Sequence, residues 1–200
     1  MRIGLLGGSF DPVHRAHIEL AKTALRELDL DQVQLVPARQ PWQKPRLAAS
    51  CEDRLAMVKL AIADTPGLLV NPIELNRPGK TYTIDTLNAL PADHDYFWLL
   101  GSDQLQNFPT WHRWQDIAKL VTLVVAHRPG AALALPNELQ KQVDEGQAKV
   151  QVMAFTPMEI SATRLRQAIK EGSSTALCWL DPTVASYIAD NSLYQTEDNA

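Results

Sequence analysis

The segment Arg2–His17 reads RIGLLGGSFDPVHRAH, and it decides the fold class. A short apolar run, Arg2–Leu6, ends in Gly7 and Gly8, and apolar residues then recur at helical spacing over Pro12–Leu28. At such a strand-to-helix turn the free backbone N–H groups and the helix dipole attract phosphate. Adjacent glycines also let the main chain approach a ligand closely. The segment therefore predicts a strand, a phosphate-binding turn and a helix.

The same alternation of strand and helix continues along the chain. Further apolar runs predict strands at Val33–Val36, Leu68–Asn71, Tyr96–Leu100, Val121–His127 and Val150–Phe155. Helices are predicted at Cys51–Asp64, Tyr82–Leu90, Trp111–Leu120, Ala162–Glu171 and Asp181–Asp190. This alternation implies an α/β fold with a doubly wound, mostly parallel sheet and helices on both faces. In such sheets ligands bind beyond the carboxyl ends of the strands.

The composition favours one globular domain. The chain has 200 residues, of which 46% are hydrophobic and 21% charged, so it can bury a core and stay in solution. We expect a single domain over residues 1–200, whose C-terminal part, from about residue 156, is helical. The longest apolar stretch, about Leu120–Ala126, is far shorter than the roughly 20 residues of a membrane-spanning helix. No membrane association is expected.

The cysteine content and the net charge limit the cellular compartments and the binding partners to be expected. Cys51 and Cys178 lie far apart with no CxxC motif, which predicts no disulfide framework and a place in the reducing cytoplasm. The N-terminus breaks into glycines too early for a signal peptide. The net charge of -4 excludes a protein that coats nucleic acid by bulk charge. The same acidic balance suggests a poor binder of anions.

His14 and His17 add chemistry to the glycine turn. Three residues apart on a helix, they share one face near its positive end. Beside a phosphate, two histidines are suited to donating hydrogen bonds to charge that develops in a transition state. Alternatively, the pair is bonded to the local backbone; a metal site would need a third ligand, which the sequence does not show. The turn matches neither the GxGxxG fingerprint nor a P-loop.

Two segments carry a resemblance to a known superfamily. Residues 7–17, GGSFDPVHRAH, resemble the GG[TS]FDPxHxGH signature of nucleotidyltransferases that transfer a nucleotide from ATP or CTP, with Ala16 where glycine is usual. Residues 160–166, ISATRLR, resemble the ISxTxxR signature of the same superfamily, although alone they also fit an ordinary capped helix. The resemblance implies a Rossmann-like nucleotidyltransferase fold in which both segments hold the ATP triphosphate, with Mg2+ as counter-ion.

The resemblance also implies roles for individual residues. His14 and His17 would be the catalytic groups. The residues expected to bind ATP are Gly7, Gly8, Ser9, Phe10, His17, Lys44, Gly101, Asp103, Ser161, Thr163 and Arg166. Gln43 stands where the family commonly has a histidine, which leaves Lys44 as the candidate for a phosphate contact from that loop.

The middle of the chain resembles the nicotinate mononucleotide adenylyltransferases. Residues 81–87, TYTIDTL, match the family's [ST]YTxxTL segment, and its GxD, tryptophan and RPG are matched at residues 101–103, 111 and 128–130. The substrate-binding residues implied are Thr83, Asp85, Asp103, Trp111 and Arg128. Trp111 would stack on the pyridine ring and Thr83 would lie near its carboxylate. Without the resemblance, Trp111 is equally well read as a core tryptophan.

The reaction implied joins ATP and nicotinate mononucleotide to give nicotinate adenine dinucleotide and pyrophosphate. The enzyme would be a monomer or small homo-oligomer without nucleic-acid partners. Three rivals remain: a transferase acting on phosphopantetheine, a nucleotide sensor without catalysis, and a nicotinamide-dependent oxidoreductase, which the absent GxGxxG disfavours. The preference for nicotinate over nicotinamide and the role of residues 131–147 stay open.

Overall fold

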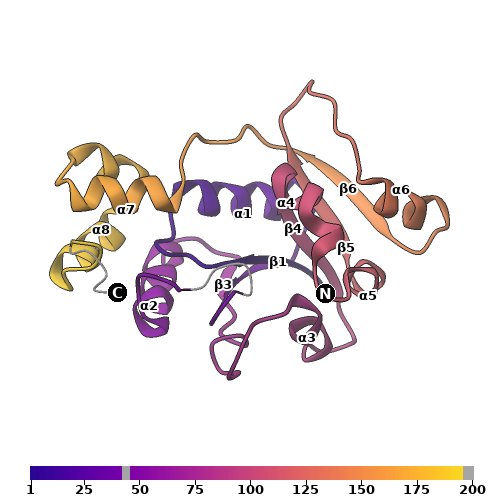
Figure 1. Ribbon diagram of the computed structural model, residues 1–200, viewed down its shortest axis with the longest axis horizontal. Coiled ribbons are helices and arrows are strands. Elements are labelled where there is room, and N and C mark those ends of the chain that lie inside the picture. The colour runs from indigo at the N-terminus through magenta and orange to yellow at the C-terminus, as the bar shows by residue number, and fades with distance from the viewer. Residues whose placement is uncertain (42–45, 196–200) are drawn as a thin grey trace.

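The computed structural model describes residues 1–41 and 46–195. Within them, six strands form one sheet in the order β3-β2-β1-β4-β5-β6, and every neighbouring pair is parallel (Figure 1). The strands are β1 (Arg2–Gly8), β2 (Gln32–Pro37), β3 (Leu68–Val70), β4 (Asp95–Gly101), β5 (Thr122–His127) and β6 (Lys149–Ala154). The predicted α/β, doubly wound fold is confirmed.

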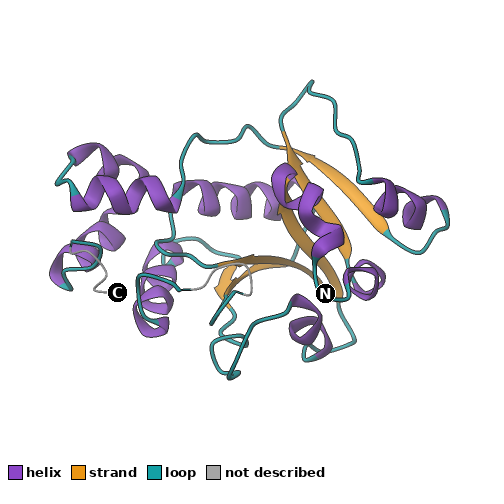
Figure 2. Cartoon of the chain, in the orientation of Figure 1, coloured by secondary structure: helices purple, strands orange, loops and turns teal. Residues whose placement is uncertain are grey.

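Helices cover both faces of the sheet (Figure 2). One apolar cluster packs α1 (Arg15–Glu27) and α2 (Cys51–Ile62) on the first face. A second cluster packs α3 (Thr83–Asn88), α5 (Trp114–Leu120) and α6 (Asn137–Asp144) on the opposite face. β5 shows why both faces are apolar: Val124 and Ala126 enter the first cluster, Leu123 and Val125 the second. Alternate strand residues thus reach two different cores.

The C-terminal helices extend the first cluster. Three C-terminal helices, α7 (Ala162–Lys170), the 3-10 helix η2 (Ser174–Trp179) and α8 (Pro182–Asp190), contribute Leu165, Ala176 and Val184 to it, respectively. Figure 1 shows these helices grouped beyond one end of α1. Ser161 caps α7 as predicted, because its Oγ accepts a hydrogen bond from the Arg164 N–H at 3.3 Å.

The structure changes several predicted helix boundaries. α1 begins at Arg15 instead of near Pro12, because His14 still has an extended backbone (φ -145°, ψ 168°). α5 begins at Trp114 instead of Trp111, because Arg113 is left-handed (φ 55°). Two helices were not predicted: α6, within the unpatterned residues 131–147, and the six-residue α4 (Ser102–Asn107). In the part of the chain that the structure describes, no helix has the length and apolar character needed to cross a membrane.

Candidate active site

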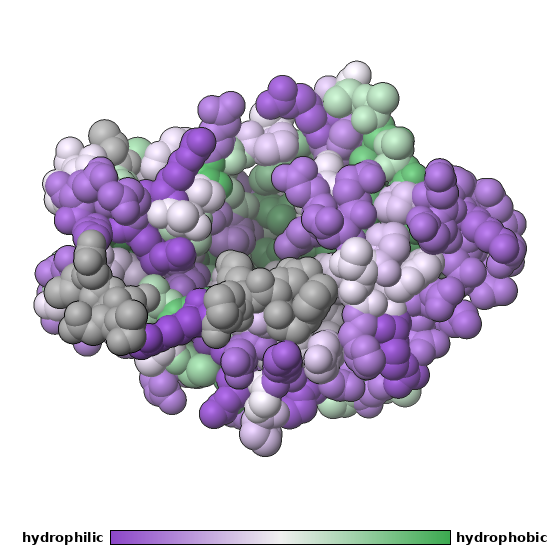
Figure 3. All heavy atoms as spheres, viewed as in Figure 1, coloured by the Kyte–Doolittle hydropathy of each residue, from purple (hydrophilic) through white to green (hydrophobic). Residues whose placement is uncertain are grey.

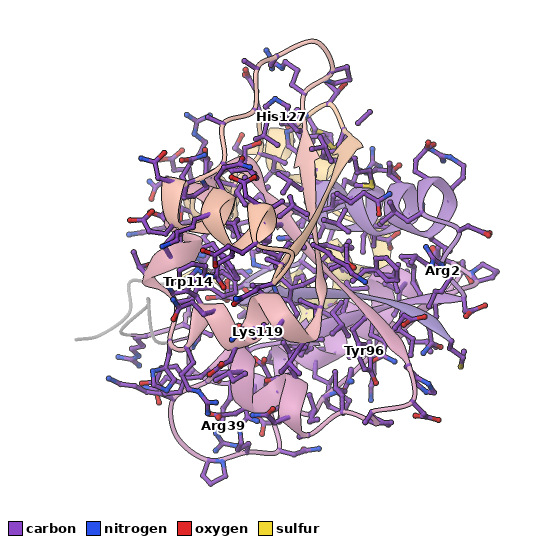
Figure 4. All side chains as sticks on the ribbon, turned by 90° about the vertical axis from the view of Figure 1, so that its right-hand side faces the viewer. Arg2, Arg39, Tyr96, Trp114, Lys119 and His127 are labelled. Carbon is purple, nitrogen blue, oxygen red and sulfur yellow. The ribbon has the colours of Figure 1, made fainter. Side chains whose placement is uncertain are left out.

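The predicted site residues gather at the carboxyl edge of the sheet. In the parallel register Gly7 pairs with Val36 and Gly101 with Ala126, so the ends of β1, β2, β4 and β5 lie along one edge. Figure 4 shows His127, at the end of β5, far from Tyr96 and Lys119 at the opposite edge. The surface is hollowed in the middle of the face seen in Figure 3, with hydrophobic residues on its floor and hydrophilic ones around it.

The two glycines of the turn are needed first for packing. A Cβ on Gly7 would lie 2.8 Å from the Trp98 ring, and one on Gly8 would lie 3.0 Å from the Phe10 ring. Phe10 itself is buried and has a left-handed backbone (φ 47°). Its ring meets the His17 ring edge-on, with centroids 5.0 Å apart. The Phe10 side chain is therefore a buried support for the His17 ring.

His14 and His17 form a stacked pair at the start of α1. Their ring centroids are 3.7 Å apart, and the His14 backbone N–H donates to His17 Nδ1 at 3.2 Å. Because Nδ1 accepts, a neutral His17 carries its proton on Nε2 and is a hydrogen-bond donor there. Burial lowers the pKa of His14 to about 4, so that ring is neutral at pH 7. His14 is the N-cap residue and His17 lies in the first turn, so the pair flanks the positive end of the helix.

The second motif meets the first at this helix start. Arg166 Nη1 donates to the main-chain oxygen of Asp11 at 2.7 Å and lies 4.0 Å from the Asp11 carboxylate. Ser161 and Thr163 are exposed at the N-terminus of α7. Two segments 155 residues apart in sequence are therefore in direct contact, as the two signatures require.

The residues expected around a pyridine ring form a neighbouring group. The half-buried Trp111 ring packs against Phe108, at 5.5 Å, and at a right angle against Trp98, at 6.4 Å. The Tyr82 ring lies 4.7 Å from that of His112, which brings Thr83, the first residue of α3, toward this segment. Because Trp98 also covers Gly7, the aromatic group is continuous with the end of β1.

The comparisons with known proteins agree with this geometry. A family model described as cytidylyltransferase-like matches residues 5–168. A Bordetella pertussis protein named "probable nicotinate-nucleotide adenylyltransferase" is 54% identical over 97% of this chain and 98% of its own length. A Bordetella petrii protein of the same name is 56% identical over 97% and 99%. The chain belongs to the nicotinate-nucleotide adenylyltransferase family. This membership confirms the prediction of a nucleotidyltransferase of NAD biosynthesis.

A solved structure supports the fold of this adenylyltransferase independently. The nicotinic acid mononucleotide adenylyltransferase of Plasmodium falciparum, complexed with NaAD, superposes with a TM-score of 0.77 at 18% identity. The superposition covers 96% of this chain and 97% of the other. At this level of sequence identity the superposition shows a shared fold only, so the residue roles must be argued from this chain's own geometry.

Other predicted residues of the adenylyltransferase lie around the same edge or outside the described residues. Asp103 is exposed in the first turn of α4, and Arg128 is exposed directly after β5. Asp85 is exposed in the first turn of α3. Ala16 is half-buried in α1. Lys44, with Gln43, lies outside the described residues.

Sequence reasoning missed the buried polar residues that hold the site together. Arg54, 1% exposed, donates to the backbone oxygens of Ser9 and Ala38 at 2.8 and 2.7 Å, joining the ends of β1 and β2. Asp11 has a similar joining role in the first motif, where its position before Pro12 was visible but its partners were not. An arginine on an amphipathic helix is ordinarily read as solvated, so Arg54 had no local signal.

A second unpredicted contact lies beside Arg128. Ser102 Oγ is 2.9 Å from His127 Nδ1, and His127 Nε2 is 3.2 Å from the Ala131 oxygen. Since Nε2 faces a carbonyl oxygen, it is the donor there. The single proton of the Ser102 hydroxyl can go to Nδ1 or to the Ala126 oxygen, which lies 3.3 Å from Oγ. His127 thereby ties the start of α4 to the turn that contains Arg128.

Proposed function

We propose that the acceptor phosphate of nicotinate mononucleotide attacks the α-phosphate of ATP at the start of α1. A bond forms between that phosphate oxygen and the α-phosphorus, and the bond from the α-phosphorus to the bridging oxygen breaks. Nicotinate adenine dinucleotide and pyrophosphate are the products. The contact between Arg166 and Asp11 supports this reading best, because it joins both phosphate motifs at one helix N-terminus.

The chemistry needs alignment and charge neutralisation more than a base. The acceptor phosphate is already anionic at pH 7, so no residue has to deprotonate it. A neutral His14 and an Nε2–H donor on His17 fit that requirement. His17 would donate to the α-phosphate as charge grows there, and Arg166 would neutralise the leaving pyrophosphate.

Mg2+ is proposed to enter with ATP. Among residues 1–41 and 46–195 there is no group of three or more histidine, cysteine, aspartate or glutamate side chains that could hold a metal ion. Mg2+ ordinarily keeps several waters and binds to nucleotide phosphates with few protein carboxylates, so this donor set fits a nucleotide-borne ion. When bound, the ion neutralises charge on the phosphates.

On the acceptor side, Trp111 is proposed to stack on the pyridine ring. Its packing against Trp98 and Phe108 holds the indole in one orientation while part of it stays accessible. Thr83, at the N-terminus of the short helix α3, would lie near the pyridine carboxylate.

One assay separates the candidate acceptors. Purified protein is given ATP and Mg2+ with nicotinate mononucleotide, nicotinamide mononucleotide or phosphopantetheine, and pyrophosphate release is measured. We expect release with the pyridine nucleotides, faster with the nicotinate form, and none with phosphopantetheine. If neither pyridine nucleotide releases pyrophosphate, the proposed function is wrong.

A further inference from the structure

The carboxylate of Asp11 lies where three segments meet. The backbone N–H groups of Ala48 and Ala49 donate to its two oxygens at 2.8 and 3.0 Å, and the Tyr194 hydroxyl donates to Oδ1 at 2.8 Å. Arg166 binds the main-chain oxygen of the same residue. Asp11 is 2% exposed, so these bonds are shielded from water. The last turn of the chain is thus tied to the first motif across 183 residues.

Arg166 bonds to the backbone carbonyl of Asp11 and not to its carboxylate. A buried carboxylate beside an arginine commonly forms a bidentate ion pair. Here Arg166 Nη1 lies 4.0 Å from Asp11 Oδ2, and its short bond, 2.7 Å, goes to the carbonyl instead. The Arg166 side chain is 30% exposed. A guanidinium has five N–H donors, so one bond to a carbonyl leaves it capacity for a phosphate.

Tyr194 is a permanent donor in this arrangement. Burial and the neighbouring Asp11 carboxylate raise the pKa of its hydroxyl far above the usual range, so it stays protonated at every physiological pH. Tyr194 follows α8 in a left-handed backbone conformation (φ 64°). The Asp11 carboxylate is therefore bonded at Oδ1 by a hydroxyl that keeps its proton.

We propose that Tyr194 is a positioning residue for ATP: by satisfying the Asp11 carboxylate, it leaves Arg166 available to the nucleotide's phosphates. Without the hydroxyl, the Asp11 carboxylate loses the donor on Oδ1, and Arg166, whose Nη1 lies 4.0 Å from the other oxygen, Oδ2, can move closer to compensate. The guanidinium is then drawn from the phosphates into an ion pair. This inference rests on the proposed contact between Arg166 and ATP.

The test compares two tyrosine variants of the whole chain. Tyr194→Phe removes the bond to Asp11, and we expect KM and Kd for ATP to rise about tenfold while kcat and the KM for nicotinate mononucleotide change less than about twofold. Tyr187→Phe is the matched control, because the Tyr187 hydroxyl on α8 donates to Asp53 Oδ1 at 3.0 Å instead of to Asp11. It should leave the ATP constants unchanged. Equal changes in both variants would mean that the C-terminal helices are merely anchored, and would overturn the proposal.

Arg166→Lys separates this inference from the proposed function. We expect it to raise the KM for ATP, and we expect Tyr194→Phe to add little on that background, because the two changes act on one unit. If Arg166→Lys leaves the KM for ATP unchanged, the proposed role of Arg166 is wrong and the inference falls with it. If Arg166→Lys raises the KM but Tyr194→Phe does not, the role of Arg166 stands and the inference alone fails. Urea unfolding identifies conditions in which every variant is folded.

Discussion

At the scale of single residues, the fold places the two histidines of the first motif in different surroundings. His14 is buried and its pKa is lowered to about 4, so it is a neutral ring that packs against its neighbour. His17 is held from below by Phe10 and through Nδ1 by the His14 backbone, which directs its donor function to Nε2. A ring fixed on two sides loses little freedom when it binds, as a preorganised donor should.

Removing the His17 ring tests this assignment. We expect His17→Ala to lower kcat about 100- to 1000-fold, the usual cost of one preorganised transition-state donor, while the thermal midpoint stays near wild type. Steady-state kinetics and a melting curve measure the two quantities. His94→Ala is the control, because His94 precedes β4 at the opposite edge of the sheet and should retain full turnover. Normal kcat in His17→Ala would rule out the role.

At the scale of elements, the contact between β1 and β4 supports the acceptor side. Gly7 on β1 lies under the Trp98 ring of β4, and that ring packs at a right angle on Trp111. Because Gly7 has no side chain, the Trp98 ring can pack directly on the β1 backbone, and the position of Trp98 in turn sets that of Trp111. A phosphate-binding reading of the glycine pair, argued from the sequence, misses this packing role.

A methyl group at Gly7 tests that contact. Gly7→Ala places a Cβ 2.8 Å from the Trp98 ring, and we expect it to lower the free energy of unfolding by about 1–3 kcal/mol and to raise the KM for nicotinate mononucleotide. Gly101→Ala is the matched control for stability, because its Cβ would meet no atom within 4 Å and its backbone is extended (φ -81°). Urea unfolding should separate the two; equal stabilities would contradict the packing role.

At the scale of the whole molecule, two buried groups give stability opposite dependences on pH. The lowered pKa of His14 contributes stability above pH 6.5 that is lost as the pH falls through 4. Glu74 is buried under α3, where Thr86 Oγ1 donates to it at 2.6 Å, and burial raises its pKa to about 7. Its contribution is present below pH 4.5 and is lost as the pH rises through 7. Between pH 4.5 and 6.5, His14 makes the free energy of unfolding rise with pH and Glu74 makes it fall, so the two contributions oppose each other.

The Glu74→Gln variant tests the contribution of Glu74 to the pH dependence of stability. The amide still accepts the Thr86 hydroxyl but does not ionise. Relative to wild type, we expect the variant to gain roughly 3 kcal/mol of unfolding free energy as the pH rises from 4.5 to 7. Urea unfolding at several pH values measures the difference, with the exposed Glu159→Gln as control. A constant difference across this range would show that Glu74 has no raised pKa.

The tertiary structure also shows why the net charge is a poor guide to anion binding. A net charge of -4 suggests a poor binder of anions, yet the fold brings two arginines, Arg166 and Arg54, to the first motif. Anion binding depends on the local arrangement of donors, which a sum over the chain does not describe.

The amino-acid sequence by itself determined the local features of this protein. Short apolar runs were enough to predict all six strands, and Ser161 caps the helix predicted at Ala162–Glu171. The two motifs proposed to bind phosphate were likewise recognisable, because each is contiguous in sequence. The short helix α4 was missed because only Leu105 in it is buried, which leaves no periodic pattern.

Only the tertiary structure decided which distant groups meet. Tyr194 reaches Asp11, Arg54 reaches Ser9, and Glu74 reaches Thr86, and in each pair the partner is chosen by how helices pack on the sheet. A buried polar side chain must find a hydrogen-bond partner, but the sequence near it does not say which one. The residues proposed to perform the chemistry were therefore visible in the sequence, while those that pack and bond around them came into view only when distant segments were brought together.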